Sequence, residues 1–460
     1  MTSQTLVIGA NPAGLTAAYE LSGCQYGVSV LEASGSVGGL YRTEGYQGYR
    51  IDWVDSPLST QMNAVEQFWR GLLPTETVEV KRRSLIYFHH RLFNYPLSFT
   101  NAFKHLGPTD IALTGLSYLK NWFARQQVSP TEARTAEDWI NQRFGPHLHR
   151  IFFDSYFEKV WGCRGEQLAP SCASQLLRKP AAQAVTYPAL GGSQLWEACR
   201  DRLVQNGASV CLSTQAVRLE HMDNRITQAI ALKNGTLQTF PVDHLISSLS
   251  LLELVTQLNA PSDVQQAARC LKYRHIAQVA LILNKANLFV EQDIYVQCPE
   301  VFVSRIQNFK NWGEARMGDS DKTCLGLTYF CDASDALWQM GEDELVCLAS
   351  QELVDLGLVE TLEQVEAGTV MRQHQAVPVE TPETFRHRAI VLEYCDHFKN
   401  LQTIGRDGLH CHTRLETDIL SGQSAAENIV SGRSASAFCR LTGDRTGRSF
   451  HAQSTVHRAL

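Results

Sequence analysis

The chain has 460 residues, 44% of them hydrophobic and 19% charged, and its formal net charge is −6 at pH 7. A chain of this length can bury a large core and divide into two or three domains or one interleaved pair. The small acidic excess provides no basic field, which argues against a nucleic-acid partner.

Cysteine usage and hydropathy bear on the compartment. The 13 cysteines are scattered singly, without a Cys-x-x-Cys pair, and the first residues do not read as a secretory signal. This pattern is typical of reduced thiols in the cytosol. No uninterrupted apolar run reaches the length of about 18 residues that a spanning helix needs. We therefore expect a cytoplasmic protein without a transmembrane segment.

The first predicted elements are a buried strand at residues 5–8, a turn and a helix at residues 13–21. Gly9 begins the turn, and Pro12 occupies a first helical position ahead of Ala13. The N-terminus of such a helix offers free N–H groups and a positive dipole end to phosphates. This arrangement is typical of a dinucleotide site.

A second strand at residues 27–31 ends at Glu32, where a carboxylate can accept hydrogen bonds from a ribose. In dinucleotide sites the first glycine permits the turn, the middle one admits the pyrophosphate, and the last lets helix and strand pack closely. Gly9 and Gly14 match the outer two, but Asn11 replaces the middle one. Because Asn tolerates positive φ, we expect Asn11 to crowd the phosphates without excluding them. The alternative is a Rossmann-like fold that has lost its ligand.

The stretch after Glu32, residues 38–43 (GGLYRT), resembles the second flavin signature of the amine oxidase and protoporphyrinogen oxidase superfamily. In that family the segment wraps the pyrophosphate and ribityl chain of FAD, and dehydrogenases that use NAD alone lack it. The resemblance implies FAD as the cofactor. The residues that it places at the cofactor are Gly38, Gly39, Leu40 and Arg42.

Two segments resemble helical substrate-domain segments of UDP-galactopyranose mutases and of related bacterial protoporphyrinogen-oxidase-like flavoproteins. They are residues 91–97 (RLFNYPL) and residues 153–162 (FDSYFEKVWG). In the mutases, the second segment carries a tryptophan that stacks on the uracil of the substrate. The resemblance implies this role for Trp161, with Tyr156 on the same pocket wall. The alternative for Trp161 is a core aromatic.

Later segments resemble the return of the chain into the flavin domain of these proteins. Residues 187–192 (YPALGG) precede an amphipathic helix at residues 195–203, and residues 208–212 read as a strand. The resemblance implies that Val217 meets the adenine through its backbone.

Residues 404–408 (IGRDG) resemble the family segment that closes the flavin site, which would place Gly405 and Arg406 beside the cofactor. A helix beginning near Asp418, followed by Ile419, would point its N-terminal amides at the pyrimidine edge of the flavin. Amides in that position stabilise negative charge on the reduced ring.

One segment departs from the family pattern. After a strand at residues 50–52 the relatives carry Gly-Gly-His or Gly-Pro-His beside the flavin, whereas this chain reads WVDSP at residues 53–57. Side chains at Val54 and Asp55 would occupy space that is open to flavin or substrate in the relatives. We therefore expect Asp55 to line the substrate site.

Several polar residues have competing interpretations. His410 and His412 resemble a metal pair, but no third ligand lies at a convincing spacing, so we predict no metal site. His89 and His90 read as a solvated turn or strand end, with a substrate contact as the alternative. Arg305 is expected to face inward from a half-buried strand, where it either has a structural role or binds an anion of the substrate. The sequence identifies no catalytic residue.

These features predict an α/β fold in which a Rossmann-type FAD-binding domain is interleaved with a substrate domain of helices and an antiparallel sheet. The expected ranges are 1–75, 190–255 and 385–435 for the FAD-binding domain, 76–189 and 256–384 for the substrate domain, and 436–460 for a mobile tail. The resemblance implies an FAD-dependent oxidoreductase that takes a hydride from a C–N or C–C bond of a small molecule. The alternatives are a mutase-like enzyme acting on a nucleotide sugar without net redox change, and a non-catalytic flavoprotein.

Overall fold

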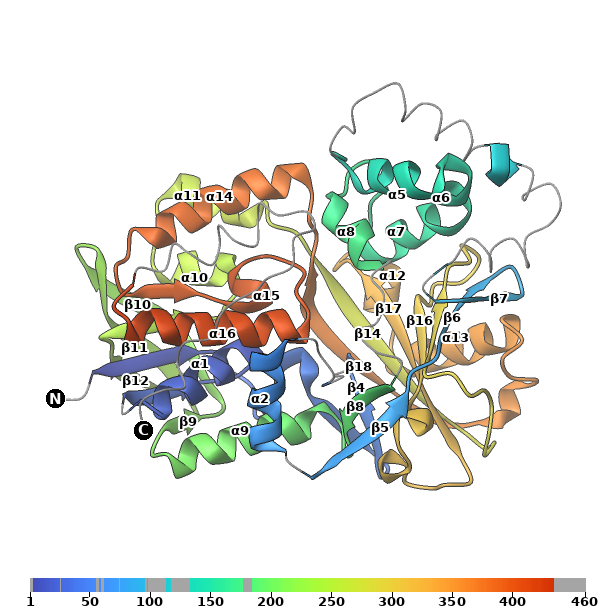
Figure 1. The fold of residues 1–460 in the computed structure, drawn as a ribbon, viewed down its shortest axis with the longest axis horizontal. Helices are drawn as coiled ribbons and strands as arrows, with labels where there is room; N and C mark the ends of the chain where they lie inside the picture. The colour runs from blue at the N-terminus through green and yellow to red at the C-terminus, as the bar shows by residue number, and fades with distance from the viewer. Residues whose placement is uncertain are drawn as a thin grey trace.

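The computed structural model contains two sheets that lie side by side, with a group of helices above the second one (Figure 1). The residues that it describes are 3–24, 26–54, 58, 62–73, 75–95, 97, 113–116, 133–176 and 184–433. Asp55 and the predicted tail at residues 436–460 lie outside these ranges.

The first sheet is five-stranded and parallel throughout, in the order β19-β13-β1-β2-β9. Its strands are β1 (Gln4–Ile8), β2 (Gly27–Leu31), β9 (Ser209–Cys211), β13 (His244–Ser247) and β19 (Leu401–Thr403). In β1, Val7 pairs with Val30 on one side and Ile246 on the other. The central strand is therefore made first; β2 follows it after one helix, whereas β13 comes from a distant part of the chain.

Helices cover both faces of this sheet because its strands are apolar on both faces. Val7, Val30 and Ile246 pack against α1 (Pro12–Ser22), α2 (Asn63–Leu72), α9 (Gly192–Gln205) and α16 (Leu415–Val430). Leu6, Ile8 and Leu245 face the opposite way, toward α10 (Leu251–Gln257), α11 (Ser262–Arg269) and α14 (Pro382–Asp396). An antiparallel sheet of β10 (Thr214–Met222), β11 (Arg225–Lys233) and β12 (Thr236–Pro241) adjoins this second layer.

The second sheet has seven strands in the order β18-β14-β17-β16-β15-β6-β7. It is antiparallel except where β15 pairs with β6. Its strands are β6 (Ser84–Phe88), β7 (Arg91–Asn94), β14 (Tyr273–Leu283), β15 (Asp293–Val296), β16 (Arg305–Asn308), β17 (Thr323–Cys331) and β18 (Val365–Pro378).

Helices also cover this second sheet. α13 (Glu342–Asp355) packs on one face. The helical group comprises α5 (Ala136–Phe144), α6 (Pro146–Phe152), α7 (Asp154–Trp161) and α8 (Pro170–Leu176), and it shares an aromatic core with β6 and β7. The short helix α12 (Ala336–Gln339) follows β17.

The remaining elements are short. They are the hairpin of β3 (Thr43–Tyr46) and β4 (Tyr49–Asp52), the pair of β5 (Thr77–Lys81) and β8 (Ala184–Pro188), helix α15 (Gly405–Gly408), and 3-10 turns at Gly39–Tyr41, Phe309–Trp312, Glu314–Arg316 and Leu362–Gln364.

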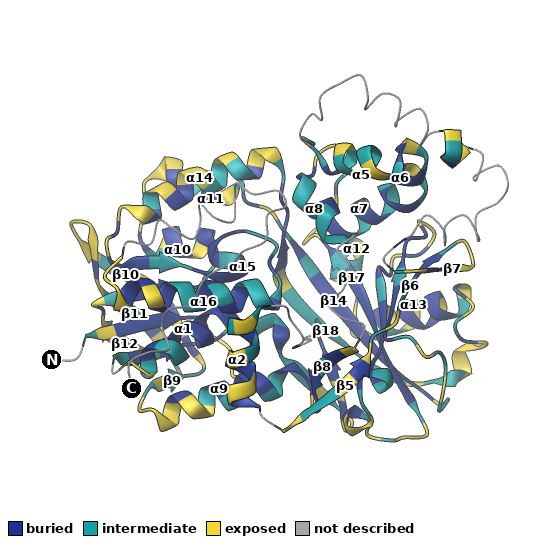
Figure 2. Cartoon of the chain, in the orientation of Figure 1, coloured by how far each residue is buried: buried dark blue, intermediate teal, exposed yellow. Residues whose placement is uncertain are grey.

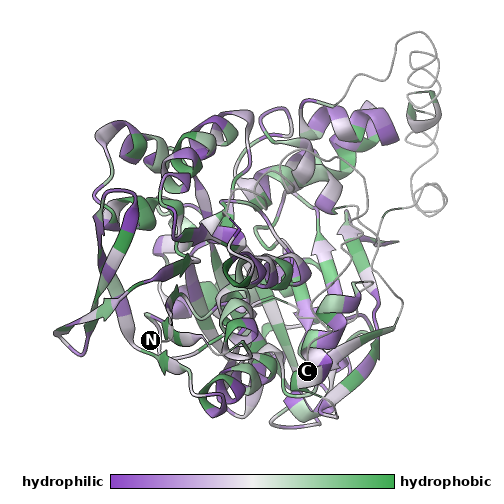
Figure 3. Ribbon diagram, turned by 60° about the vertical axis from the view of Figure 1, so that its left-hand side comes forward, coloured by the Kyte–Doolittle hydropathy of each residue, from purple (hydrophilic) through white to green (hydrophobic). Residues whose placement is uncertain are grey.

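Burial follows the two sheets. The strands of both sheets are mainly buried, whereas the outer sides of α9, α11 and α14 are exposed (Figure 2). Hydrophobic residues gather along the central strands, and hydrophilic ones on the outer sides of the helices (Figure 3). In the described part of the chain, every helix falls short of the length and hydrophobicity that crossing a bilayer requires.

The predicted α/β class is confirmed, with small shifts in element bounds. The first helix begins at Pro12 rather than Ala13, because proline suits the first helical position. The last helix begins at Leu415 rather than near Asp418. Every cysteine that the structure describes is free.

Candidate functional site

The turn between β1 and α1 is held by backbone geometry that only small residues permit. Gly9 has φ +99°, a conformation that side chains rarely adopt. A Cβ on Gly14 would lie 2.0 Å from the Gly9 carbonyl oxygen, so any larger residue would push helix and strand apart. Ser248, which the sequence reading missed, closes this turn by donating its hydroxyl to the Ile8 carbonyl at 2.9 Å.

Asn11 caps helix α1. Its φ is −81° and its ψ 176°, so the tolerance of Asn for positive φ is not used here. Its side-chain oxygen accepts the Gly14 N–H at 3.1 Å, which is the usual role of an N-cap asparagine. Among the described residues, the neighbouring Ala13 N–H has no acceptor. The helix therefore keeps one open donor on its first turn.

Glu32 lies at the end of β2 and faces the same turn. One carboxylate oxygen accepts the Ala10 N–H at 2.7 Å, and the other accepts the backbone and hydroxyl donors of Ser34. A carboxylate has about four acceptor positions, so one remains for a further donor. Val217 lies on β10, which adjoins this strand end through the bond from the Thr214 N–H to the Glu32 carbonyl. The β10–β11 register shifts at Val217, which leaves this residue unpaired in a β-bulge.

The segment that follows, Gly38 to Arg42, packs directly on the turn. The Gly38 N–H donates to the Ala10 carbonyl at 2.8 Å, and a Cβ on Gly39 would lie 3.0 Å from the Asn11 Cβ. The N–H groups of Gly39 and Leu40 have no acceptor among the described residues. Arg42 binds the Gly39 carbonyl at 2.9 Å and lies over the Trp53 ring.

A third segment, at α15 and the start of α16, completes the group. A Cβ on Gly405 would lie 3.0 Å from the Ala13 Cβ, so the third segment touches the first. Arg406 is buried and donates to the Tyr41 hydroxyl at 3.2 Å, so the third segment also touches the second. The Arg406 Nε has no partner in the described structure.

The start of α16 carries further open donors. Its N-cap residue, Arg414, makes no side-chain capping bond. Asp418 and Ile419 are buried within its first turns, and the Thr413 hydroxyl donates to Asp418 at 2.6 Å. Burial raises the pKa of the Asp418 carboxyl to about 6, although Arg406 opposes this shift. The amides at the helix start therefore belong to residues three positions earlier than predicted.

Trp53 occupies the position at which the sequence departs from the family pattern. It is 2% exposed and packs with Ile276, Ala376 and Val377 of β14 and β18. Its Nε1 donor is buried without a partner in the described structure. Val54 packs instead against the core beside α1. Residues 53 and 54 are the described part of this segment. Of the two, Trp53 places its indole beside Arg42.

The predicted substrate residues lie in the other part of the molecule, at the boundary of α7 and the second sheet. Trp161 is 3% exposed and its ring centroid lies 5.7 Å from that of Phe157. Tyr156 is buried too, and burial, then the neighbouring Tyr95, raises the pKa of its phenol against an opposing effect of Arg305. The structure thus brings Tyr156 and Arg305 together but places Trp161 in an aromatic core.

Arg305 is paired with a buried acid. Asp293, fully buried at the start of β15, binds the Arg305 Nε at 3.1 Å and also Arg82 at 3.1 Å. The Arg305 guanidinium also lies over Tyr295, which stacks on Tyr95. Arg305 is therefore held by a carboxylate that it shares with Arg82.

A second buried charge pair was missed by the sequence reading. Arg316 is fully buried and binds Asp52, which also accepts the Tyr187 hydroxyl at 2.6 Å and the Thr43 hydroxyl. Asp52 was visible only as the last residue of a strand, and Arg316 lies 264 residues away. No local sequence signal connects them.

His410 and His412, which resemble a metal pair in the sequence but were predicted to bind no metal, follow helix α15. His410 is 1% exposed and neither ring nitrogen has a partner in the described structure. Its ring packs edge-on against Tyr273 at 4.7 Å, and burial lowers the pKa of the imidazole to about 3. His410 therefore packs in the protein interior beside Tyr273.

Comparisons with known proteins support one family. Residues 12–430 match the model of the flavin-containing amine oxidoreductases. A search of curated protein sequences found no match.

Among solved structures, a reduced UDP-galactopyranose mutase aligns over 97% of this chain and 98% of its own, at 16% identity and a TM-score of 0.79. A protein from Exiguobacterium sp. 255-15, assigned as a protoporphyrinogen oxidase, aligns over 94% and 100% at 14% identity and 0.72. Cyclohexylamine oxidase from Brevibacterium oxydans IH-35A aligns over 94% and 99% at 15% identity and 0.67. These likenesses establish the fold, and the match over residues 12–430 establishes that the chain belongs to the flavin-containing amine oxidoreductase family.

Proposed function

We propose that the protein is an FAD-dependent oxidoreductase that takes a hydride from a C–N or C–C bond of a small molecule. The observation that carries the proposal is the convergence of three chain segments on a group of open donors. These donors are the N–H groups of Ala13, Gly39 and Leu40, the uncapped start of α16, and the Arg406 Nε. Unpaired donors at a helix start suit an anionic ligand such as a pyrophosphate.

The residues of this group fit FAD along its length. In this proposal the Glu32 carboxylate accepts a ribose hydroxyl, and the bulged backbone of Val217 holds the adenine. The turn of Gly9, Asn11, Pro12, Ala13 and Gly14 binds the pyrophosphate with Gly38 and Gly39. Leu40 and Arg42 flank the ribityl chain. Gly405, Arg406, Asp418 and Ile419 surround the flavin end.

Asn11 fits this proposal in spite of its position. Its oxygen is engaged with the Gly14 N–H, but its amide nitrogen remains a donor that can face a phosphate. The side-chain N–H of Asn11 therefore replaces the Gly14 N–H as a donor to the phosphate. The pyrophosphate keeps a neutral, donor-rich surface.

Bound FAD supplies the hydride acceptor of the reaction. The chain supplies the surroundings: the amides at the start of α16 and the Arg406 guanidinium stabilise negative charge, and the apolar group around Trp53 excludes water. The unpaired Trp53 Nε1 can donate to a polar atom of flavin or substrate. No described side chain is required to act as an acid or base.

Purification and anaerobic titration test the proposal. The purified protein should show the visible absorption of a bound flavin, and that absorption should bleach when a reducing small-molecule amine is added without oxygen. A protein that neither retains FAD nor takes it up would contradict cofactor binding. A protein whose bound FAD is bleached by dithionite but by no small-molecule donor would support the non-catalytic flavoprotein.

A mutase-like activity on a nucleotide sugar is the second candidate. Its support is the alignment with UDP-galactopyranose mutase over nearly the whole of both chains. Such an activity predicts that UDP-galactose binds the reduced protein and not the oxidised one. The oxidoreductase proposal predicts that the oxidised protein binds its substrate.

The domain boundaries are proposed on the same basis. All strands of the parallel sheet come from residues 4–31, 209–247 and 401–403. We propose that the ranges 1–75, 190–255 and 385–435 form the FAD-binding domain, with residues 76–189 and 256–384 between them.

A further inference from the structure

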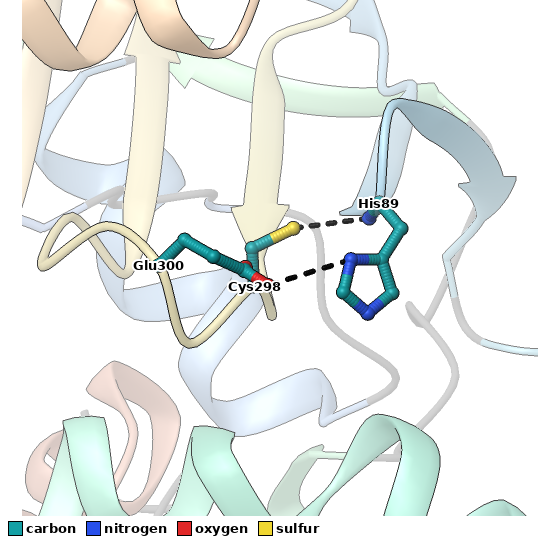
Figure 4. A group of neighbouring side chains, drawn as sticks. All are labelled: His89, Cys298 and Glu300. Carbon is teal, nitrogen blue, oxygen red and sulfur yellow. Dashed lines mark hydrogen bonds and ion pairs between the residues drawn. The ribbon is translucent and has the colours of Figure 1, made fainter.

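His89, Cys298 and Glu300 form a cluster that none of the proposed flavin contacts uses. Their potential ligand atoms all lie within 4.8 Å of one another, and Figure 4 shows the three side chains turned toward a common space. The His89 Nδ1 is 3.5 Å from a carboxylate oxygen of Glu300. We propose that these three residues bind a zinc ion.

The register of the second sheet brings the cluster together. β6 and β15 run parallel, with Tyr87 opposite Val296. Two residues further along each strand come His89 and Cys298, so the two emerge side by side at the same edge of the sheet. The Gln297 N–H extends this ladder by donating to the Tyr87 carbonyl at 3.0 Å. The meeting of imidazole and thiol is therefore a direct consequence of strand pairing.

The loop that carries Cys298 and Glu300 is fixed at both ends. The Lys159 ammonium donates to the carbonyls of Val296, at 3.3 Å, and Val303, at 3.0 Å. The Glu352 carboxylate accepts the N–H groups of Phe302 and Val303. Supports of this kind hold a site in place before the ligand arrives. His89 itself sits in the tight β6–β7 turn with φ +44°.

The chemistry of the three ligand atoms favours zinc over other metal ions. A thiolate, an imidazole and a carboxylate are the usual ligands of Zn²⁺, whereas Mg²⁺ and Ca²⁺ prefer oxygen alone. Zinc bonds of about 2.0–2.3 Å in a tetrahedron put neighbouring ligand atoms roughly 3.3–3.8 Å apart. His89 and Glu300 are exposed, so small side-chain rotations close the cluster to that size. Three protein ligands leave the fourth position for water.

Binding is coupled to proton release. Burial raises the pKa of the Cys298 thiol; the His89 N–H, which donates to Sγ at 3.1 Å, and the Lys159 ammonium lower it, while Glu300 raises it. Zinc binding therefore forms the Zn–S bond as the thiol loses its proton to solvent, with no change of oxidation state. Because zinc competes with the proton for the thiol sulfur, zinc binds more tightly as the pH rises.

The test is titration of the full-length, chelator-treated protein with ZnCl₂ by calorimetry, and with CoCl₂ by absorption spectroscopy. We expect one ion per chain, proton release on binding, and a sulfur-to-cobalt band in the near ultraviolet. Cys298→Ser should abolish that band, and His89→Ala and Glu300→Gln should each weaken zinc binding by at least about tenfold.

Two control variants distinguish zinc binding at this cluster from nonspecific zinc binding elsewhere on the chain. Cys347→Ser removes an exposed cysteine of α13, and His90→Ala removes the adjacent imidazole, and both should bind zinc as the unchanged protein does. Thermal melts check that each variant is folded. If Cys298→Ser fails to fold, His89→Ala and Glu300→Gln still decide the test, because they alter exposed side chains. The proposal is overturned if no one-to-one binding is seen, if His89→Ala and Glu300→Gln retain full affinity, or if the two controls weaken binding equally.

Discussion

The turn beside the parallel sheet and the Arg305 strand of the seven-stranded sheet differ in how their polar groups are partnered. Around the parallel sheet, donors are left open: the Ala13 and Gly39 N–H groups and the Arg406 Nε have no acceptor in the described structure. In the seven-stranded sheet, the charge of Arg305 is paired with the buried Asp293. Because an unpaired buried donor is costly, the open donors indicate where a ligand binds.

The second half is closed by its own contacts. Arg82 and Arg305 share Asp293, and the aromatic rings of Tyr95 and Tyr295 stack at 4.4 Å. A substrate that binds there has to meet aromatic and apolar surface, or displace an existing ion pair. We therefore infer that the flavin half is specified by polar contacts and the substrate half by shape. Four variants test this contrast.

Trp161→Ala should give the largest effect. A buried tryptophan in an aromatic core loses about 3–5 kcal/mol of unfolding free energy on truncation. Denaturant unfolding measures this loss, and Trp139→Ala serves as control because Trp139 is only partly buried beside Arg143. A variant that melts like the unchanged protein but binds a substrate about 5- to 150-fold more weakly would restore Trp161 to the pocket wall.

The variant His410→Asn tests how stability depends on pH where His410 packs against Tyr273 of the second sheet. The folded-state pKa of His410 is lowered to about 3 by burial, so its contribution is fully present above the unfolded pKa of about 6.5 and is lost as pH falls toward 3. Asparagine suits the φ of +43° and does not titrate. Between pH 6.5 and 3, the unfolding free energy of the unchanged protein should fall by about 2–4 kcal/mol more than that of the variant.

Two buried acids change stability in the opposite direction. Burial raises the pKa of Asp407 to about 7 and of Asp418 to about 6, so their contribution falls as pH rises from about 4 to 7. Asp407 and Asp418 are present in both the unchanged protein and the His410→Asn variant. The difference between the two unfolding free energies, measured at several pH values, therefore reports on His410. Equal acid sensitivity in the two proteins would show that His410 is solvated.

Glu32→Ala should affect the flavin half alone. Loss of a charge-assisted hydrogen bond to a ribose should weaken FAD binding by about 1.5–3 kcal/mol. Fluorescence titration with FAD measures the change, and Glu20→Ala, at the far end of α1, is the matched control. If FAD affinity is unaltered, Glu32 only orders the turn through Ala10 and Ser34.

Asn11→Gly should give the smallest effect. Replacing an N-cap asparagine by glycine costs only a few tenths of a kcal/mol, and it frees the Gly14 N–H for a phosphate. FAD affinity should therefore stay the same or rise. Asn11→Asp keeps the cap but adds a negative charge, so it should weaken FAD binding. Loss of binding in Asn11→Gly would instead identify the side chain as a ligand.

The flavin half could be predicted well because its signals are local. The predicted strand at residues 27–31 coincides with β2, and the turn at Gly9 begins where expected. The differences were also local: Asn11 serves as the cap of α1, which was not foreseen, and α16 begins at Leu415 rather than near Asp418. The site assignments themselves stay predictions, as does the adenine contact of Val217.

The substrate half could not be predicted in the same way because its contacts join distant residues. The sequence placed Arg305 on a half-buried strand but could not show Asp293 beside it, since that contact depends on how β15 and β16 pair. Similarly, the cluster of His89 and Cys298 depends on a strand register between residues 209 positions apart. Residue type and spacing carry no information about such pairings.

The position of β1 has a consequence for how the protein is made. β1 lies between β2 and β13, and Gly422 of α16 packs so closely on α1 that a Cβ there would lie 2.3 Å from the Ala13 carbonyl oxygen. At a synthesis rate of about 5–20 residues per second, Gly9 leaves the ribosome roughly 20–80 seconds before Gly405. During that interval the growing chain holds a glycine turn whose neighbouring segment at α15 and α16 does not yet exist. A chain released before α16 is translated therefore exposes the apolar side of α1, and becomes a substrate for chaperones and proteases rather than a smaller flavoprotein.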